Sequence, residues 1–508
     1  MSNTFMNNLK EATNYKLTEN GAVAHKSTMS AVYDMFAFGG AYRKRTDEDC
    51  ILLFRNAYKE DPDLALKCLF YLRDCRGGQG ERRFFRLAYH DLCTLEPSAA
   101  LLNLEKIPEF GRWDDLVYIV DGTPLWYKAM EIIAHQLNLD LQCQTPSLLA
   151  KWLPSENASS AETKRLAASI RISLKLTHKK YRKVLSVLRK RINVVERLMS
   201  TNQWDKIEFD KIPSKAGLIY KNAFARREIL AKKYEAFAKS AETTVNAKTL
   251  YPYEIAAKAL ERDRGIWWYD NFKDLSETDR LMIQKYWDNQ PDYLNGKPAS
   301  MLCIIDTSGS MTGEKASAPI NVATSLGIYC AERMTGPFAG HYISFASKPQ
   351  LIKVEGVDFV DRCRRIVKTN LVDNTNLEAA FDLILQAATM EGAKEEDIPK
   401  TIVVISDMEI DSATRRGWGN SGSRWTQEGA ATAMENIKSK WAAAGLKCPK
   451  LVYWNVDARH NTILDRGEDV SFVSGCSPVL FEQIITGVSG YDLMLQKLNS
   501  ERYAHIFR

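Results

Sequence analysis

The sequence predicts a multidomain protein in which an all-α region of helical repeats precedes an α/β domain with a parallel sheet. Its 508 residues are too many for a single hydrophobic core. Amphipathic helical patterns follow one another as far as Trp287, and strand and helix patterns alternate after a polar stretch at residues 288–298 that contains Pro and Gly. We therefore expect three parts: an arm over 1–26, a helical domain over 27–287 and an α/β domain over 298–508.

The helical region consists of short amphipathic runs that begin at Asp or Thr caps and are joined by brief links. No strict repeat period is visible, so the succession of helices alone suggests a stacked, HEAT-like solenoid of helix pairs. The clearest runs are Asp47–Tyr58, Asp63–Asp74, Gly80–Leu95 and Trp126–Leu139.

The second region has the alternation of a Rossmann-like, doubly wound sheet, because crossovers through helices require parallel strands. Apolar runs predict strands at 301–306, 341–346, 351–355, 401–406, 450–455 and 470–474. The predicted helices cover 317–334, 376–390, 427–444, 477–485 and 490–498.

Composition is that of an ordinary soluble globular protein, with 45% hydrophobic and 26% charged residues. The polar N-terminus lacks the apolar stretch of a signal peptide, and no apolar run approaches membrane-spanning length. The ten cysteines are scattered without a CxxC pair. We therefore expect a reduced, cytoplasmic protein without a membrane partner.

Oxygen-bearing side chains follow two of the predicted strands. Asp306, Ser308 and Ser310 come after the strand MLCIID, Asp407 ends TIVVISD, and Thr375 opens a helix. Carboxyl ends of parallel strands meet at one sheet edge, where ligands bind. Hard divalent cations take oxygen ligands, so these five residues predict a metal site, with Mg²⁺ as the expected ion. The alternative is that both aspartates only cap helices.

Positive charge is concentrated in one segment. Residues 151–250 hold 23 Lys and Arg against 9 Asp and Glu, a net charge of +14, so the rest of the chain carries −8. Such asymmetry is typical of a protein with a polyanion partner, although a basic helix face can also be plain solvated surface. The side chains that we predict to contact such a polyanion here are Lys175, His178, Lys179, Lys180, Arg182, Lys183, Arg189, Lys190, Arg191, Lys215 and Lys221.

A Gly-rich break between two helices, RDCRGGQGERR, carries two further candidates, Arg76 and Arg82. Backbone amides beside arginines can hold a phosphate, but the segment lacks the GK[ST] ending of a P-loop. A helix C-cap followed by a new helix start explains the glycines equally well.

Several segments together resemble a known family. RDCRGGQGERRFFRLA and IPEFGRWDDL look like the TROVE module of Ro ribonucleoproteins, and DTSGS with Thr375 and Asp407 resembles the metal-ion-dependent adhesion site of von Willebrand factor A (vWA) domains. KWLPSE, YRKVLSVLRKRINVVE and ISDMEID are similar to a TROVE-like branch that carries its own vWA domain. The resemblance implies a ring of helices that binds single-stranded RNA ends inside and structured RNA outside.

Taken together, these features predict a non-enzymatic RNA-binding protein whose vWA domain offers Mg²⁺ to an acidic residue of a partner protein. The alternative is a metal-dependent interaction scaffold without specific RNA binding. A nuclease is a weaker hypothesis, because no His or Glu general base accompanies the predicted metal ligands. The loop Met408–Trp425, with Arg415, Arg416, Trp418, Arg424 and Trp425, is a further candidate contact for a polyanion or peptide.

Overall fold

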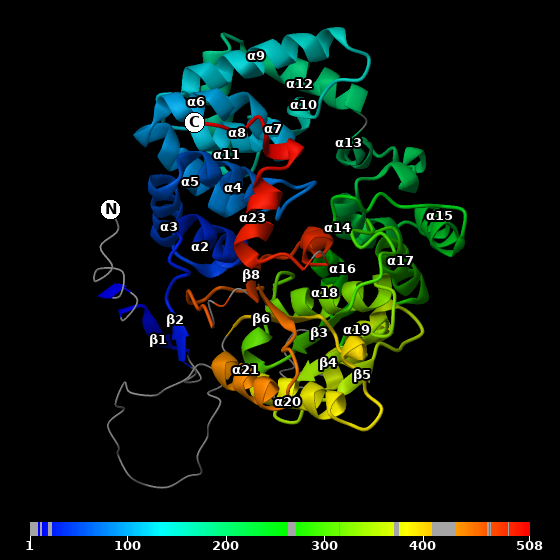
Figure 1. The fold of residues 1–508 in the computed structure, drawn as a ribbon. Helices are drawn as coiled ribbons and strands as arrows, with labels where there is room; N and C mark the ends of the chain where they lie inside the picture. Colours follow the sequence, from blue (N-terminus) through cyan, green and yellow to red (C-terminus); the bar gives the residue numbers. More distant parts are fainter. Residues whose placement is uncertain are drawn as a thin grey trace, which may run out of the picture. The chain divides into compact units, whose positions relative to one another are not determined.

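The computed structural model describes residues 9–10, 13–18, 23–192, 194–262, 271–313, 315–369, 375–408, 433–464, 467, 469–485 and 487–508. Its contacts divide the chain into two compact units (Figure 1). The sheet unit comprises Met1–Thr46 and Leu250–Ser500, and the helical unit comprises Asp47–Thr249 and Glu501–Arg508.

The sheet unit is built on six strands in the order β5-β4-β3-β6-β7-β8. All six predicted strands are present, within one or two residues of their expected ends. They are β3 (Met301–Asp306), β4 (His341–Phe345), β5 (Leu351–Lys353), β6 (Thr401–Ser406), β7 (Lys450–Asn455) and β8 (Val470–Ser474). A separate two-stranded antiparallel sheet pairs β1 (Tyr15–Leu17) with β2 (Val23–His25).

One feature of the predicted sheet was wrong: it is mixed, because β5 pairs with β4 antiparallel while the other four pairings are parallel. Only residues 346–350 join β4 to β5. A link that short forms a hairpin, whereas a parallel partner requires a crossover of a dozen residues or more.

Helices cover both the central and the outer strands of this sheet. One of them, α18, contacts β3, β4 and β6, and α16 and α19 pack on it. A further helix, α17, packs with α16 and α19, while α20 packs on β4 and α21. Two more helices, α2 and α23, contact β8. Their bounds are α2 (Ala31–Phe38), α16 (Pro252–Ala259), α17 (Glu277–Asp288), α18 (Pro319–Arg333), α19 (Phe359–Thr369), α20 (Leu377–Ala388), α21 (Ala433–Ala443), α22 (Phe481–Ile484) and α23 (Gly490–Leu498).

The approach of α18 to the central strand depends on Gly327. A Cβ at this position would lie 2.1 Å from Ile305 Cδ1. Contacts that short do not occur between real atoms, so a larger residue here would require Ile305 or α18 to shift. The glycine thereby permits the close packing of α18 on β3.

The helical unit is formed by short helices that pack mainly on sequence neighbours, as the succession of amphipathic runs predicted. The helices are α3 (Asp47–Glu60), α4 (Pro62–Arg73), α5 (Arg82–Leu95), α6 (Pro97–Asn103), α7 (Ile107–Phe110), α8 (Trp113–Val120), α9 (Trp126–Gln142), α10 (Leu149–Trp152), α11 (Ala161–Ser173), α12 (His178–Ile192), α13 (Val195–Ser200), α14 (Ser214–Ala225) and α15 (Glu228–Lys239).

The chain ends in the helical unit rather than in the sheet unit. Tyr503 is buried there, with its ring 5.7 Å from that of Phe110 and its hydroxyl 3.1 Å from Asp74 Oδ2. Arg502 Nη2 donates to the other oxygen of Asp74 at 2.9 Å. The compact units therefore follow different residue ranges from the three parts expected from sequence pattern, because both chain ends pack on elements distant in sequence. In the part of the chain that the structure describes, no helix combines the length and apolarity needed to cross a bilayer.

Candidate functional site

The carboxylate of Asp306 lies at the edge where the central strands end. Ile305 of β3 is paired with Ile405 of β6, so Asp306 and Ser406 leave the sheet together. Ser406 Oγ donates to Asp306 Oδ2 at 2.5 Å, and the Ser308 backbone N–H donates to Oδ1 at 2.9 Å. The second bond spans two residues and precedes the short turn Gly309–Met311, whose N-cap is Ser308, and Asp306 is completely buried.

A second carboxylate, Asp407, lies next to the first and is also buried. Burial, followed by the negative charge of Asp407, raises the pKa of Asp306 to about 7. Two desolvated carboxylates so close together repel each other, and a bound cation relieves that repulsion.

Two serine hydroxyls lie in the loop after β3, and a hydrogen bond joins them. Ser308 Oγ and Ser310 Oγ lie 3.0 Å apart in the loop that leads into a short 3-10 turn, Gly309–Met311. Hydroxyl and carboxylate oxygens are the donors that Mg²⁺ prefers, so the residues fit an oxygen-liganded divalent cation. Among the described residues there is no cluster of three or more His, Cys, Asp or Glu suited to a metal, so a cation here would depend on the hydroxyls.

The fifth predicted ligand is Thr375. It is buried, with 3% of its surface exposed, in the segment that leads into α20. Its membership of the donor set stays a prediction.

Sequence reasoning missed Arg459, which follows β7. Its Nη2 donates to Asp407 Oδ2 at 2.6 Å and to the Ser310 carbonyl oxygen at 2.7 Å. The residue therefore joins two of the three loops of the site. A signal was present in the sequence: β7 is parallel to β6, so the DARH segment after it must leave the same edge of the sheet.

The basic segment presents a charged face along α12. Lys179, Lys180, Arg182, Lys183 and Lys190 are all exposed. In the described part of the chain, none of their side chains forms an ion pair. Tyr181, Leu185 and Leu188 on the opposite face are buried. Because the helix is anchored by its apolar face, these five cationic groups are held toward solvent.

Two predicted RNA contacts on the same helix are used inside the protein instead. Arg189 donates to the carbonyl oxygens of Ala150 and Leu153 and to Ser155 Oγ, each at 2.8 Å. Arg191 Nη1 donates to the Leu141 carbonyl oxygen at 2.8 Å. These side chains cap the C-terminal ends of α10 and α9, and burial lowers the pKa of Arg189.

The remaining basic candidates are dispersed. His178 Nδ1 lies 2.8 Å from Glu156 Oε1, and Lys175 is exposed at a positive φ of 53° just before α12. Lys215 and Lys221 lie on α14, where the first is exposed and the second half-buried. His178 is itself the first residue of α12, next to the exposed row, whereas Lys215 and Lys221 belong to a different helix.

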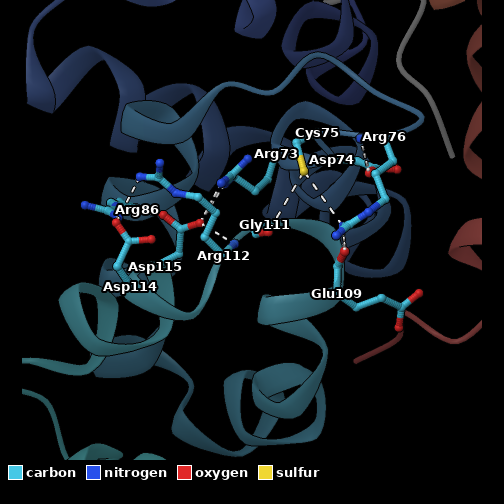
Figure 2. A network of polar contacts seen from close by, with 10 residues as sticks. All are labelled: Arg73, Asp74, Cys75, Arg76, Arg86, Glu109, Gly111, Arg112, Asp114 and Asp115. Carbon is cyan, nitrogen blue, oxygen red and sulfur yellow. Dashed lines mark hydrogen bonds and ion pairs between the residues drawn. The ribbon is translucent and has the colours of Figure 1, made fainter. Parts of the chain in front are cut away.

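The two motifs that resembled the TROVE module form one structural junction, shown in Figure 2. The Cys75 backbone N–H donates to the Phe110 carbonyl oxygen at 3.0 Å, and Arg76 donates to the Glu109 carbonyl oxygen. The amides of Gln79, Gly80 and Glu81 donate to carbonyl oxygens of α4 and Asp74. These three amides are therefore not available to a phosphate, and Arg82 is an exposed basic group at the start of α5.

A buried ion-pair network underlies this junction (Figure 2). The Asp115 carboxylate forms ion pairs with Arg73 Nη2 at 2.6 Å and with Arg86 Nε at 2.7 Å. The Asp114 carboxylate pairs with Arg86 and with Arg112, at 2.9 Å each. Burial alone would raise the pKa of Asp115, but Arg73 and Arg86 hold it below its ordinary value. Three arginines share two aspartates, so both carboxylates are paired and the network keeps one excess positive charge.

The predicted loop contact after β6 lies outside the described residues, apart from Met408. That residue is buried and has a φ of 66°, which marks a sharp turn directly after Asp407.

Comparison with models of known protein families assigns the chain to one of them. Residues 18–123 and 147–309, more than half of the chain, match the model of a domain of unknown function, DUF2828. The chain belongs to the DUF2828 family. Residues 300–496 of this DUF2828 protein match the model of a second domain of unknown function, DUF7788.

A relative and a solved structure are also similar to the DUF2828 protein. Uncharacterized protein L728 of Acanthamoeba polyphaga mimivirus is 29% identical over 515 residues, which cover 93% of this chain and 85% of the relative. The crystal structure of the Deinococcus radiodurans Ro (RSR) protein aligns with a TM-score of 0.46 and 16% identity, over 94% of this chain and all of that one. That score is too low to carry an argument about fold or function.

Proposed function

We propose that this DUF2828 protein binds RNA through its helical unit and uses its sheet unit, as a vWA-like domain, to hold a divalent cation. The row of exposed lysines and arginine on α12 carries the RNA proposal. Lys179, Lys183 and Lys190 lie within a narrow arc of the helix surface, because positions four and eleven residues apart are nearly in line at 3.6 residues per turn. The row extends over about 17 Å at 1.5 Å per residue.

The chemistry of such a row favours a phosphate backbone. Each lysine displaces a condensed counterion when it contacts a phosphate, which gives strong, salt-dependent and largely sequence-independent affinity. The motifs that resemble the TROVE module of Ro proteins further support RNA as the polyanion. The proposed activity is binding, without cleavage.

The test is fluorescence anisotropy with a labelled single-stranded oligouridylate and a labelled RNA hairpin over a range of salt concentrations. We expect the triple variant K179Q/K183Q/K190Q to bind more weakly. The slope of log affinity against log salt should fall by about 2, or 0.7 for each lost contact to a single strand.

A matched control removes three exposed lysines of the same unit that are already paired with carboxylates. Lys128, Lys232 and Lys239 pair with Glu131, Glu228 and Glu235. The variant K128Q/K232Q/K239Q should bind RNA as the wild type does. Equal loss in both variants, or no RNA binding by the wild type, would reject the α12 surface as the site.

The carboxylate and hydroxyl cluster favours a second candidate, a metal-dependent scaffold that binds an acidic residue of a partner protein. D306N separates the two candidates, because it should leave RNA affinity unchanged while removing the partner. Loss of RNA binding in D306N would instead connect the two sites.

A further inference from the structure

Arg459 supplies the positive charge beside Asp407 from within the protein. Its guanidinium shares Nη2 between Asp407 Oδ2 and the Ser310 carbonyl oxygen, at 2.6 and 2.7 Å. A divalent cation held by the same carboxylate and by Ser310 would therefore meet a resident cation. Two like charges in a partly desolvated site repel each other strongly.

A second carboxylate is already within reach of the same side chain. Arg459 Nε lies 3.9 Å from Asp457 Oδ2, and the Asp457 side chain is only 4% exposed. A side chain with the length of Arg459 can thus exchange one carboxylate for the other by rotation alone, without a change in the backbone.

The backbone that carries Arg459 is fixed by the segment that follows α2. The Ala458 N–H donates to the Ala41 carbonyl oxygen at 3.1 Å, and Arg45 Nη1 donates to the Arg459 carbonyl oxygen at 2.5 Å. Lys44 pairs with Asp457. These contacts hold the backbone of Arg459 and the Asp457 carboxylate in place while the Arg459 side chain moves between its two partners.

We propose that Arg459 is an internal counter-ion that leaves Asp407 for Asp457 when a divalent cation binds beside Asp306, so that this exchange sets the cation affinity. The inference rests on the metal site of the proposed function. It assigns to Arg459 and Asp457 a role that the predicted ligand set does not contain.

The experiment titrates Mn²⁺ into the full-length protein and measures the free ion by electron paramagnetic resonance. R459Q should bind Mn²⁺ about tenfold more tightly, as expected when one partly buried unit charge is removed from beside the site. R459K retains the charge and should stay close to the wild type. D457N removes the second partner of Arg459, so it should bind less tightly than the wild type.

The proposed exchange predicts that R459Q/D457N binds as tightly as R459Q, because Asp457, which also pairs with Lys44, affects the cation through Arg459. R365Q is the control, since Arg365 pairs with Asp361 at the surface of α19. If D457N fails to fold, as judged by circular dichroism, the comparison of R459Q with R459K decides alone.

The outcomes are distinct. Equal or weaker Mn²⁺ binding by R459Q, with wild-type binding abolished by D306N, overturns the exchange and leaves the metal site intact. Absence of Mn²⁺ binding by both the wild type and R459Q overturns the metal site, and the exchange with it.

Discussion

Arg189 and Lys190 are adjacent on α12, but their surroundings differ completely. The Arg189 guanidinium makes three hydrogen bonds at the end of α10, whereas Lys190 is exposed. One step along an α-helix rotates a side chain by about 100°, which takes it from the edge of the buried face to the solvent. Charge alone therefore does not identify a binding residue.

This difference predicts effects of very different size for the same substitution at the two positions. Arg189→Gln should lower the free energy of unfolding by about 2 kcal/mol, because it leaves the acceptors at the end of α10 without a charged donor. Lys190→Gln should change it by less than about 0.5 kcal/mol. Urea denaturation followed by circular dichroism measures both, and equal effects would contradict the assignment.

Arg459 illustrates the same limit at the predicted metal site. The aspartate, serine and threonine residues were recognised as candidate cation ligands because their side chains carry oxygen atoms. An arginine side chain does not bind a cation, so Arg459 was not considered. Its role depends on a contact between residues 459 and 407, which follow adjacent strands but lie 52 positions apart in the sequence. That these two residues are close in space can be recognised only when the order of the strands in the sheet is known.

At the level of elements, periodicity was a reliable guide. The apolar runs located all six strands. The five parallel strands are buried and read as continuous hydrophobic segments, whereas β5 is antiparallel and largely exposed. The helix α19 was not predicted, although Phe359, Cys363, Ile366 and Val367 have helical spacing and are buried. The antiparallel direction of β5 follows from the short link of residues 346–350 between β4 and β5, and the residue pattern of the strand does not reveal it.

The junction between α4 and α8 supports a prediction at this level. Asp115→Asn would leave Arg73 buried without its partner, so the helical unit should lose about 3–5 kcal/mol at neutral pH. Because the pKa of Asp115 is held below its ordinary value of 3.8, its contribution is complete above that pH and is lost as pH falls further. The difference between wild type and variant should therefore shrink in acid.

Urea denaturation at neutral and acidic pH tests this expectation. Asp91→Asn is the control, since Asp91 pairs with the half-exposed Arg55, and exposed pairs contribute about 1 kcal/mol or less. A loss as small as that of the control would show that the network is dispensable.

At the level of the whole molecule, the chain crosses between its two units more than once. Residues up to Thr46 belong to the sheet unit, and Glu501–Arg508 return to the helical unit. The final segment is anchored by the buried side chains of Tyr503 and Ile506. Domain limits drawn from composition alone do not contain such returns, because composition does not record which distant segments pack together.

The return of the C-terminus predicts that its last residues stabilise the helical unit. Tyr503→Ala should cost about 3–5 kcal/mol, as is typical of deleting a buried aromatic side chain. Hydrogen exchange should then become faster in α4 and α7, while His505→Ala, at an exposed position, leaves it unchanged. Unchanged exchange in Tyr503→Ala would show that the segment contributes nothing to these helices.

The sequence by itself determined the two classes of structure, the positions of the strands, the concentration of positive charge and the oxygen-bearing residues at the ends of β3 and β6. These properties depend on local periodicity and composition, which each segment carries independently. Only the tertiary structure decided which arginines face solvent, which cap helices and which carboxylate Arg459 pairs with. Those outcomes depend on contacts between segments far apart in the chain, where packing and desolvation decide which pairings are stable.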